Sequence, residues 1–353
     1  MDRKLDYSAF HGRFRKGDFA ERELLIAGIK TKRSGVNATS SVFGVVFGVF
    51  LTGFLVLIRS GFNVISIAFI ILCCATIIIV PIAQYIKQNK DLRLLRFAIV
   101  NGLDYRKTGF GPGNDPIELS VGHSRHATNE LEWDNIKMAD YEYTIGHGKN
   151  SRTYHMGFTC VKLSHKVPHL LLNSKQNTFF LNHSDYKVQK LQLEGDFAKV
   201  FDLFCPPNYH VDALQIFTPD VMAVLMEYGR AYDYEFIDNE VYIYSSYRMS
   251  SDPENYIRSI VDLAERLTPK LNKQAAIYRD IHVGAGVRGV VAPEGAKLKK
   301  GMPGETWLVF GAVGAIIIAV FGMIILPGAV AAMPVIVCVP IYAALIIMRI
   351  KRR

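Results

Sequence analysis

Hydrophobic residues are unevenly distributed along the chain, in four long apolar runs that flank a middle region of mixed character. The runs, none of which contains Asp, Glu, Lys, Arg or His, cover residues 40–58, 64–82, 307–326 and 329–348. A helix rises about 1.5 Å per residue, so each run is long enough to cross the roughly 30 Å hydrocarbon layer of a bilayer. The pattern predicts two transmembrane helical hairpins, at residues 39–86 and 307–348.

The first half of the middle region has the pattern of β-strands. Residues 140–145 alternate and are rich in aromatics, and residues 153–163 resume strand character after the polar, glycine-containing connection 146–152. This arrangement predicts two antiparallel strands joined by an exposed loop. Two shorter strands are expected at residues 167–172 and 178–181.

The second half changes to helical spacing. Phe197, Val200, Phe201 and Phe204 predict a helix that ends before two prolines and is followed by a strand entry. Further helices are predicted from Thr218, a good N-cap before a proline, to Gly229, and over residues 253–273, where Pro269 marks a kink or an end. Between them, residues 234–237 and 241–244 predict a β-hairpin that turns at residues 238–239.

The fold class predicted from these patterns is an α+β soluble domain flanked by two transmembrane α-helical hairpins. Its domains are a basic N-terminal arm (1–38), the first hairpin (39–86), the soluble domain (87–283), a glycine-rich linker (284–306), the second hairpin (307–348) and a basic tail (349–353). Residues 19–32 of the arm have helical character. That helix lies either on a membrane surface or against the soluble domain.

The net charge of +9 comes from the residues outside the soluble domain. Residues 1–38 hold nine Lys or Arg against five Asp or Glu, the tail adds four basic residues, and residues 87–306 hold 27 of each sign. Basic residues next to apolar runs are typical of cytoplasmic flanks that face anionic lipid. We therefore expect a multi-pass protein of a bacterial inner membrane, with both termini and the middle domain in the cytoplasm. A nucleic-acid-binding domain would carry the basic excess itself.

Two segments match the sequence motifs of known functional sites but lack the structural surroundings that such sites require. Gly284, Gly286 and Gly289 match GxGxxG, but Val290 to Pro293 do not begin the helix that a dinucleotide site requires. Cys205, His210 and Asp212 bring a thiol, an imidazole and a carboxylate close in sequence, which alone does not make a nucleophilic site. The sequence predicts no catalytic residue and no cofactor, and its five cysteines include no CxxC pair.

Seven histidines fall between residues 123 and 183, and three of them are candidate metal ligands. His123 and His126 could share a metal ion if a local turn brought them together, and His155 lies in the next predicted strand. No HExxH or comparable pattern accompanies them, so half-exposed packing residues are the favoured interpretation.

Part of the soluble domain resembles a family of uncharacterised bacterial multi-pass membrane proteins with a soluble domain of unknown function. The resemblance covers about a third of the chain and rests on three motifs: Gly195-Asp196-Phe197, Asp212-Ala213 and Thr218-Pro219-Asp220-Val221-Met222. It implies localisation in a bacterial membrane, and the family brings no activity with it.

The leading functional hypothesis is a non-enzymatic, membrane-anchored cytoplasmic scaffold that recruits partners. Its expected partners are membrane lipid and an unidentified protein, with a second copy of the chain as one candidate. One alternative is a membrane-bound enzyme with a site around His123, His126 and His155. Another is a small transport or channel component, which the absence of ionisable residues from the apolar runs disfavours.

Overall fold

The computed structural model describes one folded body in detail. The described residues are 4–12, 16–20, 23–24, 27–28, 90–109, 116–177, 190–191, 193, 195–283 and 289–298, with six isolated positions between 48 and 79. The chain divides into two compact units, residues 1–181 with 191–297 and residues 182–190 with 298–353. The first unit contains nearly all of the described residues.

Seven strands form one sheet within the described residues, in the order β1-β2-β3-β4-β6-β5, with β7 paired to β4. The strands are β1 (Asp104–Thr108), β2 (His123–Trp133), β3 (Ile136–Ile145), β4 (Arg152–Ser174), β5 (Lys190–Leu191), β6 (Phe201–Phe204) and β7 (Asp233–Ser245). The pairings of β1 with β2, β2 with β3, and β4 with β3, β6 and β7 are all antiparallel. The 23-residue β4 is the longest strand and pairs with three others.

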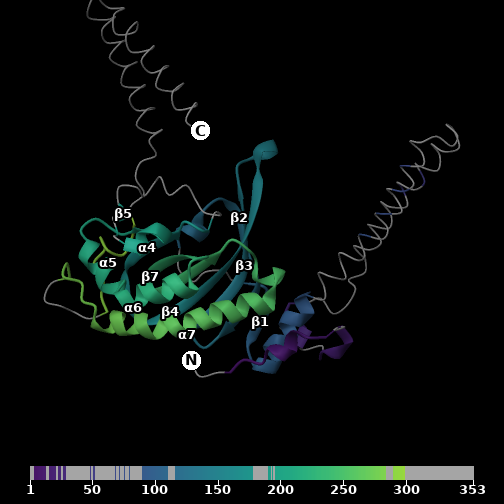
Figure 1. Cartoon of the computed structure of the whole chain (residues 1–353). Coiled ribbons are helices and arrows are strands. Elements are labelled where there is room, and N and C mark those ends of the chain that lie inside the picture. Colours follow the sequence, from purple (N-terminus) through teal and green to yellow (C-terminus); the bar gives the residue numbers. More distant parts are fainter. Residues whose placement is uncertain are drawn as a thin grey trace, which may run out of the picture. The chain divides into compact units, whose positions relative to one another are not determined.

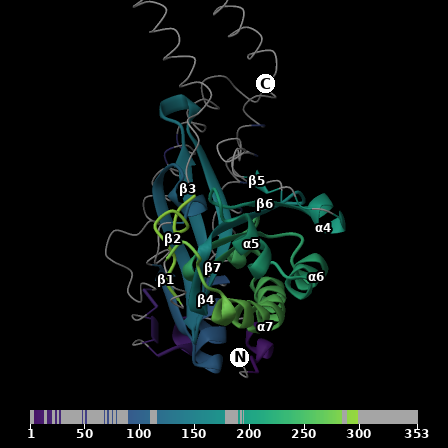
Figure 2. The ribbon, with the colours of Figure 1, turned by 90° about the vertical axis from the view of Figure 1, so that its left-hand side faces the viewer.

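The helices lie on one side of this sheet. They are α4 (Gly195–Val200), α5 (His210–Ile216), α6 (Pro219–Tyr228) and α7 (Pro253–Ile277), and residues 90–101 are also helical. Figure 1 shows α7 running along the sheet, and Figure 2 shows α5, α6 and α7 together on the same side. Short 3-10 turns over Glu118–Ser120, Gly148–Asn150 and Met249–Ser251 connect the longer elements.

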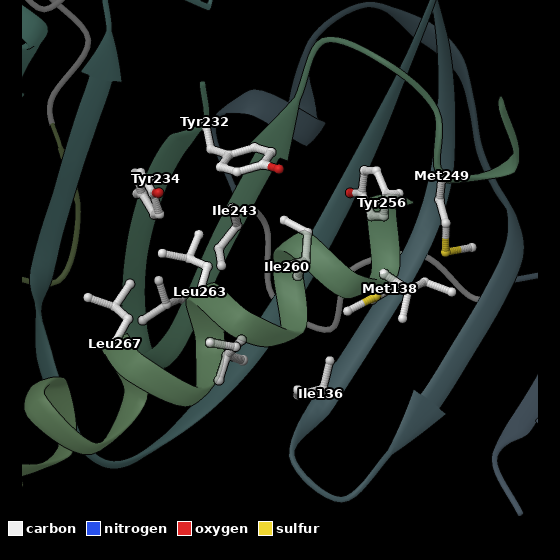
Figure 3. Packing of buried hydrophobic residues seen from close by; sticks show 14 of the residues in the cluster. Ile136, Met138, Tyr232, Tyr234, Ile243, Met249, Tyr256, Ile260, Leu263 and Leu267 are labelled. Carbon is white, nitrogen blue, oxygen red and sulfur yellow. The ribbon is translucent and has the colours of Figure 1, made fainter. Parts of the chain in front are cut away.

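The main core lies between α7 and the sheet. One stripe of α7 is fully buried, and its residues Tyr256, Ile260, Leu263 and Leu267 face the sheet (Figure 3). The stripe follows helical spacing, while residues of the opposite side of α7, such as Glu265 and Arg266, are exposed. Alternate residues of the strands meet this stripe, among them Met138 of β3 and Ile243 of β7.

The other face of the sheet holds a second, aromatic cluster. Because side chains alternate along a strand, the neighbours of Met138 and Ile243 point away from α7. The cluster contains Leu119, Ala127, Ala139, Tyr141, Tyr143, Met156, Phe158, Cys160, Tyr242 and Tyr244. The Tyr141 hydroxyl donates a hydrogen bond of 2.6 Å to the Leu119 carbonyl oxygen, which fixes the Glu118–Ser120 turn to the sheet.

The described residues of the N-terminal arm pack into the main core. Phe10 stacks on Phe97 with ring centroids 4.4 Å apart, and Leu24 and Ala27 are buried. The backbone N–H of Lys107 in β1 donates to the Ala27 carbonyl oxygen at 2.7 Å. Of the two placements expected for residues 19–32, these contacts favour packing against the soluble domain.

Several predicted elements are present, although most of them extend beyond the expected bounds. The strands expected at residues 140–145 and 153–163 are β3 and β4, joined by the expected exposed connection. The helix expected after Thr218 is α6 and ends at Gly229. The last helix runs on through Pro269 to Ile277, because the proline lies on the exposed side, where water can solvate the carbonyl that it leaves without a partner.

Other predicted elements were wrong. Phe201–Phe204 is a strand, because it pairs with β4, and only Gly195–Val200 is helical. Residues 234–244 are not a hairpin but one continuous strand, in which Asp238 has a φ of 52° and both halves pair with β4. Residues 210–216 form α5 rather than a strand. Residues 167–172 are a strand as predicted, but they continue β4 instead of forming a separate short strand. The strand expected at residues 178–181 lies outside the described residues.

The predicted fold class was wrong about the transmembrane hairpins on either side of the soluble domain. None of the helices that the structure describes has both the length and the apolarity needed to cross a bilayer. The longest, α7, is amphipathic and covers the sheet. The described fold is therefore an antiparallel sheet with helices, without flanking transmembrane hairpins. Apart from isolated positions, the four apolar runs lie outside the described residues.

Leu263→Ala tests the packing of α7. Leu263 is fully buried against the sheet, so its truncation should lower the free energy of unfolding by about 2–5 kcal/mol. Glu265→Ala, on the exposed side of the same helix, should change it by less than about 0.5 kcal/mol. Urea unfolding of the full chain, followed by the fluorescence of the buried Trp133, measures both. Equal effects of the two substitutions would contradict the packing described.

Candidate functional site

The predicted histidines lie at one end of the sheet, where the start of β2 runs beside the end of the β3–β4 hairpin. This hairpin end, residues 121–126 with 142–155, projects from the rest of the sheet (Figure 1). Gly146 and Gly148 shape the connection with φ values of 83° and 59°. A Cβ on Gly146 would lie 2.7 Å from the Asn150 carbonyl oxygen, so the turn requires glycine there.

Two of the predicted histidines meet a shared carboxylate in the middle of the hairpin end. Strand pairing aligns His126 of β2 with Glu142 of β3, and Glu142 with His155 of β4. His155 Nδ1 lies 3.0 Å from one Glu142 carboxylate oxygen, and His126 Nε2 lies 3.8 Å from the other. These three residues, the histidine row, are partly exposed and lie on one face of the sheet.

The third predicted histidine lies elsewhere. His123 Nε2 is 2.8 Å from the Gly146 carbonyl oxygen, and its ring stacks on His147 with centroids 5.0 Å apart. In the part of the chain that the structure describes, no three His, Cys, Asp or Glu side chains have a geometry that could hold a metal ion. Metal binding by His123, His126 and His155 stays a prediction. Sequence analysis missed Glu142 and His147.

The hairpin end is rich in positive charge. Arg125, Lys149 and Arg152 are exposed there, and Glu142 is the one acidic residue among residues 121–126 and 142–155. Such a surface can bind an acidic partner.

A second group of titratable residues is buried on the aromatic face. The Glu235 carboxylate accepts hydrogen bonds from the Ile117 backbone N–H at 2.7 Å and from the Tyr244 hydroxyl at 2.8 Å. His169 Nε2 lies 2.8 Å from the same carboxylate, and both side chains are almost completely excluded from water. Glu235 therefore links β4, β7 and the Glu118–Ser120 turn.

Glu118 differs from Glu235 because neither of its buried carboxyl oxygens has a hydrogen-bond partner among the described residues. Burial raises the pKa of this carboxyl well above its usual value, and repulsion from Glu235 and Asp233 raises it further. Glu118 is therefore a buried acid whose surroundings favour its protonated form, in a group that the sequence did not reveal. The only signal was an acidic residue within an otherwise apolar stretch, Pro116 to Leu119.

The Cys205 motif does not form a nucleophilic site. Cys205 is fully buried, and burial together with the nearby Asp212 charge raises the pKa of its thiol to about 11. Asp212 accepts a hydrogen bond from the Tyr278 hydroxyl at 3.0 Å, and His210 is exposed. Within the described residues no hydrogen bond joins the Cys205 thiol to His210 or Asp212. A thiol with a raised pKa is a poor nucleophile at neutral pH.

The glycine motif also lacks the geometry of a nucleotide site. Residues 284–288 lie outside the described residues, but Val290 to Ala292 are not helical. This segment instead returns to the domain: the Ala292 N–H donates to Asp280 at 2.8 Å, and the Gly295 carbonyl oxygen accepts from the His169 N–H at 2.8 Å. The residues after the motif therefore hold a loop to the sheet.

Comparisons with known proteins do not identify a family. No family model matches the chain, and no curated protein is similar to it. One solved structure has a partial likeness, the crystal structure of the mycobacterial trehalose monomycolate transport factor A, TtfA. That likeness has a TM-score of 0.32 and 9% identity, and covers 48% of this chain and 91% of the other. A TM-score this low carries no argument about fold or function.

Glu118→Gln tests the buried acid. The raised pKa means that the folded state keeps a proton that the unfolded chain releases, so the carboxyl's contribution to stability falls as pH rises above about 4.5. Glutamine cannot ionise, so the variant should be more stable than the parent at pH 8, by about 1.4 kcal/mol for each unit by which the fold raises the pKa of Glu118. The difference should shrink toward pH 4.5.

Urea unfolding at several pH values measures this difference. Glu265→Gln, an exposed position on α7, is the matched control and should show no comparable pH-dependent gain. A Glu118→Gln variant that is less stable than the parent at every pH would show that Glu118 is ionised and partnered in the fold.

Proposed function

We propose that this chain is a non-enzymatic recruitment protein of the cytoplasmic face of a bacterial membrane, and that its hairpin end binds an acidic protein partner. One observation carries the proposal. The projecting hairpin end presents three exposed cations, Arg125, Lys149 and Arg152, and its one carboxylate, Glu142, lies close to the imidazoles of His126 and His155.

The shape of the hairpin end suits recognition. Its strands are paired along their length from Ile136 with Val161 to Ile145 with Arg152, and Thr144 and Thr153 share a cross-strand hydrogen bond of 3.2 Å. On the face opposite the histidine row, Tyr143 stacks on Tyr154 at 5.4 Å. A surface held in this way loses little conformational entropy when a partner binds.

The charge of the hairpin end determines the kind of partner. Complementary charge speeds association and excludes partners of the wrong sign. The one carboxylate, Glu142, lies close to two imidazoles, which leaves the exposed Lys149 and Arg152 for a partner's acidic groups. Arg125 is also exposed, and one of its guanidinium nitrogens donates to the Leu119 carbonyl oxygen at 3.4 Å. An acidic segment of a protein meets these requirements.

The membrane location is supported by the distribution of charge in the sequence. Basic residues gather just outside the apolar runs, at Lys87, Lys90, Arg93 and Arg96 on one side and Lys297, Lys299 and Lys300 on the other. The anionic cytoplasmic leaflet attracts such clusters, each basic residue contributing about 1 kcal/mol near its surface.

An in-cell crosslinking experiment tests partner binding. A photo-crosslinking residue at position 151, in the exposed connection of the full chain, should capture a specific acidic protein. Arg125→Glu combined with Arg152→Glu should lower the yield of that adduct about tenfold, which corresponds to about 1.4 kcal/mol of binding free energy.

The matched control reverses the same charge elsewhere on β4. Lys162 and Lys166 are exposed lysines outside the hairpin end, so Lys162→Glu with Lys166→Glu should leave the adduct unchanged. An adduct that survives the arginine reversal, or that both double variants lower equally, would refute charge-guided binding at this surface.

A further inference from the structure

An exposed aliphatic surface lies where α5 meets the end of α7. Val211 and Leu214 of α5 are 65% and 48% exposed, and Ile277 and Ile281 at and after the end of α7 are 65% and 77% exposed. We call these four residues the α5–α7 patch. Figure 2 shows α5 beside α7, and the two helices are in contact. Large aliphatic side chains grouped in water indicate a surface that binds something.

Buried polar contacts fix the residues next to the patch. The Tyr278 hydroxyl donates to Asp212 at 3.0 Å, which joins the residue after Ile277 to the residue after Val211. Tyr209 stacks on His282 at 4.6 Å, and its hydroxyl donates to Asp280 at 2.9 Å. The exposure of the patch is therefore a property of the folded domain and not of a frayed helix end.

Most of the exposed charges around the patch are positive. Lys273 lies one helical turn before Ile277, and Arg279 lies between Ile277 and Ile281. Lys297 follows a segment that is held near Tyr209, since any Cβ on Gly295 would overlap the Tyr209 ring. The acidic side chains of this region, Asp212 and Asp280, are buried, which leaves Glu294 as the exposed acid among residues 205–216, 268–283 and 289–298.

Aliphatic side chains with cations at their border are the chemistry that binds anionic lipid surfaces. The apolar groups enter the headgroup boundary, and the cations contact the phosphates. Binding of a soluble protein would require only the aliphatic side chains and would leave the surrounding cations without a role. We infer that the α5–α7 patch docks on an anionic bilayer, which orients the domain on the membrane. The inference rests on the membrane location in the proposed function.

A fluorescence experiment on the full chain tests the docking. An environment-sensitive fluorescent amino acid is placed at position 281, or at the exposed position 265 of α7 as control. The chain is reconstituted with vesicles of phosphatidylcholine, alone or with phosphatidylglycerol, that carry a lipid-bound quencher. Quenching at position 281 should be severalfold stronger with phosphatidylglycerol than without it, and position 265 should show little quenching in either.

A second experiment removes the positive charges beside the patch. Lys273→Gln combined with Arg279→Gln should weaken surface binding by roughly 30-fold, since each basic residue near an anionic surface contributes about fivefold. The quenching at position 281 should then fall to the level seen without phosphatidylglycerol. Lys162→Gln combined with Lys166→Gln is the control, and the fluorescence of the buried Trp133 verifies folding of all variants.

Three results would overturn the inference. One is equal quenching at positions 281 and 265, and another is quenching that does not depend on phosphatidylglycerol. The third is a probe at 281 that is shielded from water without vesicles, which would mean that protein covers the patch, a second copy included. The crosslinking yield at position 151 distinguishes the two proposals. If the crosslinked adduct still forms at position 151 but the probe at position 281 is not quenched, the proposed partner binding is supported and only the docking on lipid is refuted.

Discussion

The fold depends on the backbone pairing of β4. Its 23 residues form antiparallel ladders with β3 and β6 on one edge and with β7 on the other, so this strand joins the two halves of the sheet. Pro168 lies in the interior of β4, although proline donates no ladder hydrogen bond. The register against β7 shifts on both sides of Val167, next to this proline. The irregularity separates the part of β4 that forms the hairpin end from the part that carries His169.

Local pattern predicted some elements well and failed where pairing decided the outcome. The helix α6 was predictable because Thr218, Pro219 and Gly229 mark its ends locally. By contrast, residues 238–239 have the composition of a turn, yet pairing of both flanks with β4 keeps β7 continuous. Phe201 and Phe204 fit a helical spacing, but their backbone forms the ladder with β4. Hydrogen bonds to a distant strand cannot be predicted from the residue pattern of a short segment.

The sequence also predicted only part of the candidate site. His126 and His155 were identifiable as a pair of candidates, but their meeting at Glu142 depends on the register of three strands. A shift of one residue would place Glu142 on the face of Tyr141 and Tyr143. The group around Glu235 was not visible at all, because His169 and Tyr244 are far from Glu118 in sequence.

The buried acids change how the charge balance of the domain should be understood. Residues 87–306 hold equal numbers of basic and acidic residues, but Glu118, Asp140, Asp212, Asp233, Glu235 and Asp280 are all buried. Burial raises the pKa of Asp140 and Asp233, and the Asp280 carboxylate is satisfied by internal donors. A formally neutral sequence thus folds with more of its negative charge inside than its positive charge. Both the hairpin end and the α5–α7 patch reflect this separation.

The loop after α7 also has a mechanical consequence. The backbone of Gly295 is hydrogen-bonded to His169, and Ala292 to Asp280, so the chain is fastened twice before Leu298. Tension on the chain beyond Leu298 would therefore load two points of the domain. The Gly295 bond would pass force into β4 at His169, whose side chain contacts Glu235 in the middle of the sheet. The Ala292 bond would pass force to Asp280, just beyond the end of α7, where the Tyr209 hydroxyl is also bound. A pull from that end is thus shared between the sheet and the helical layer.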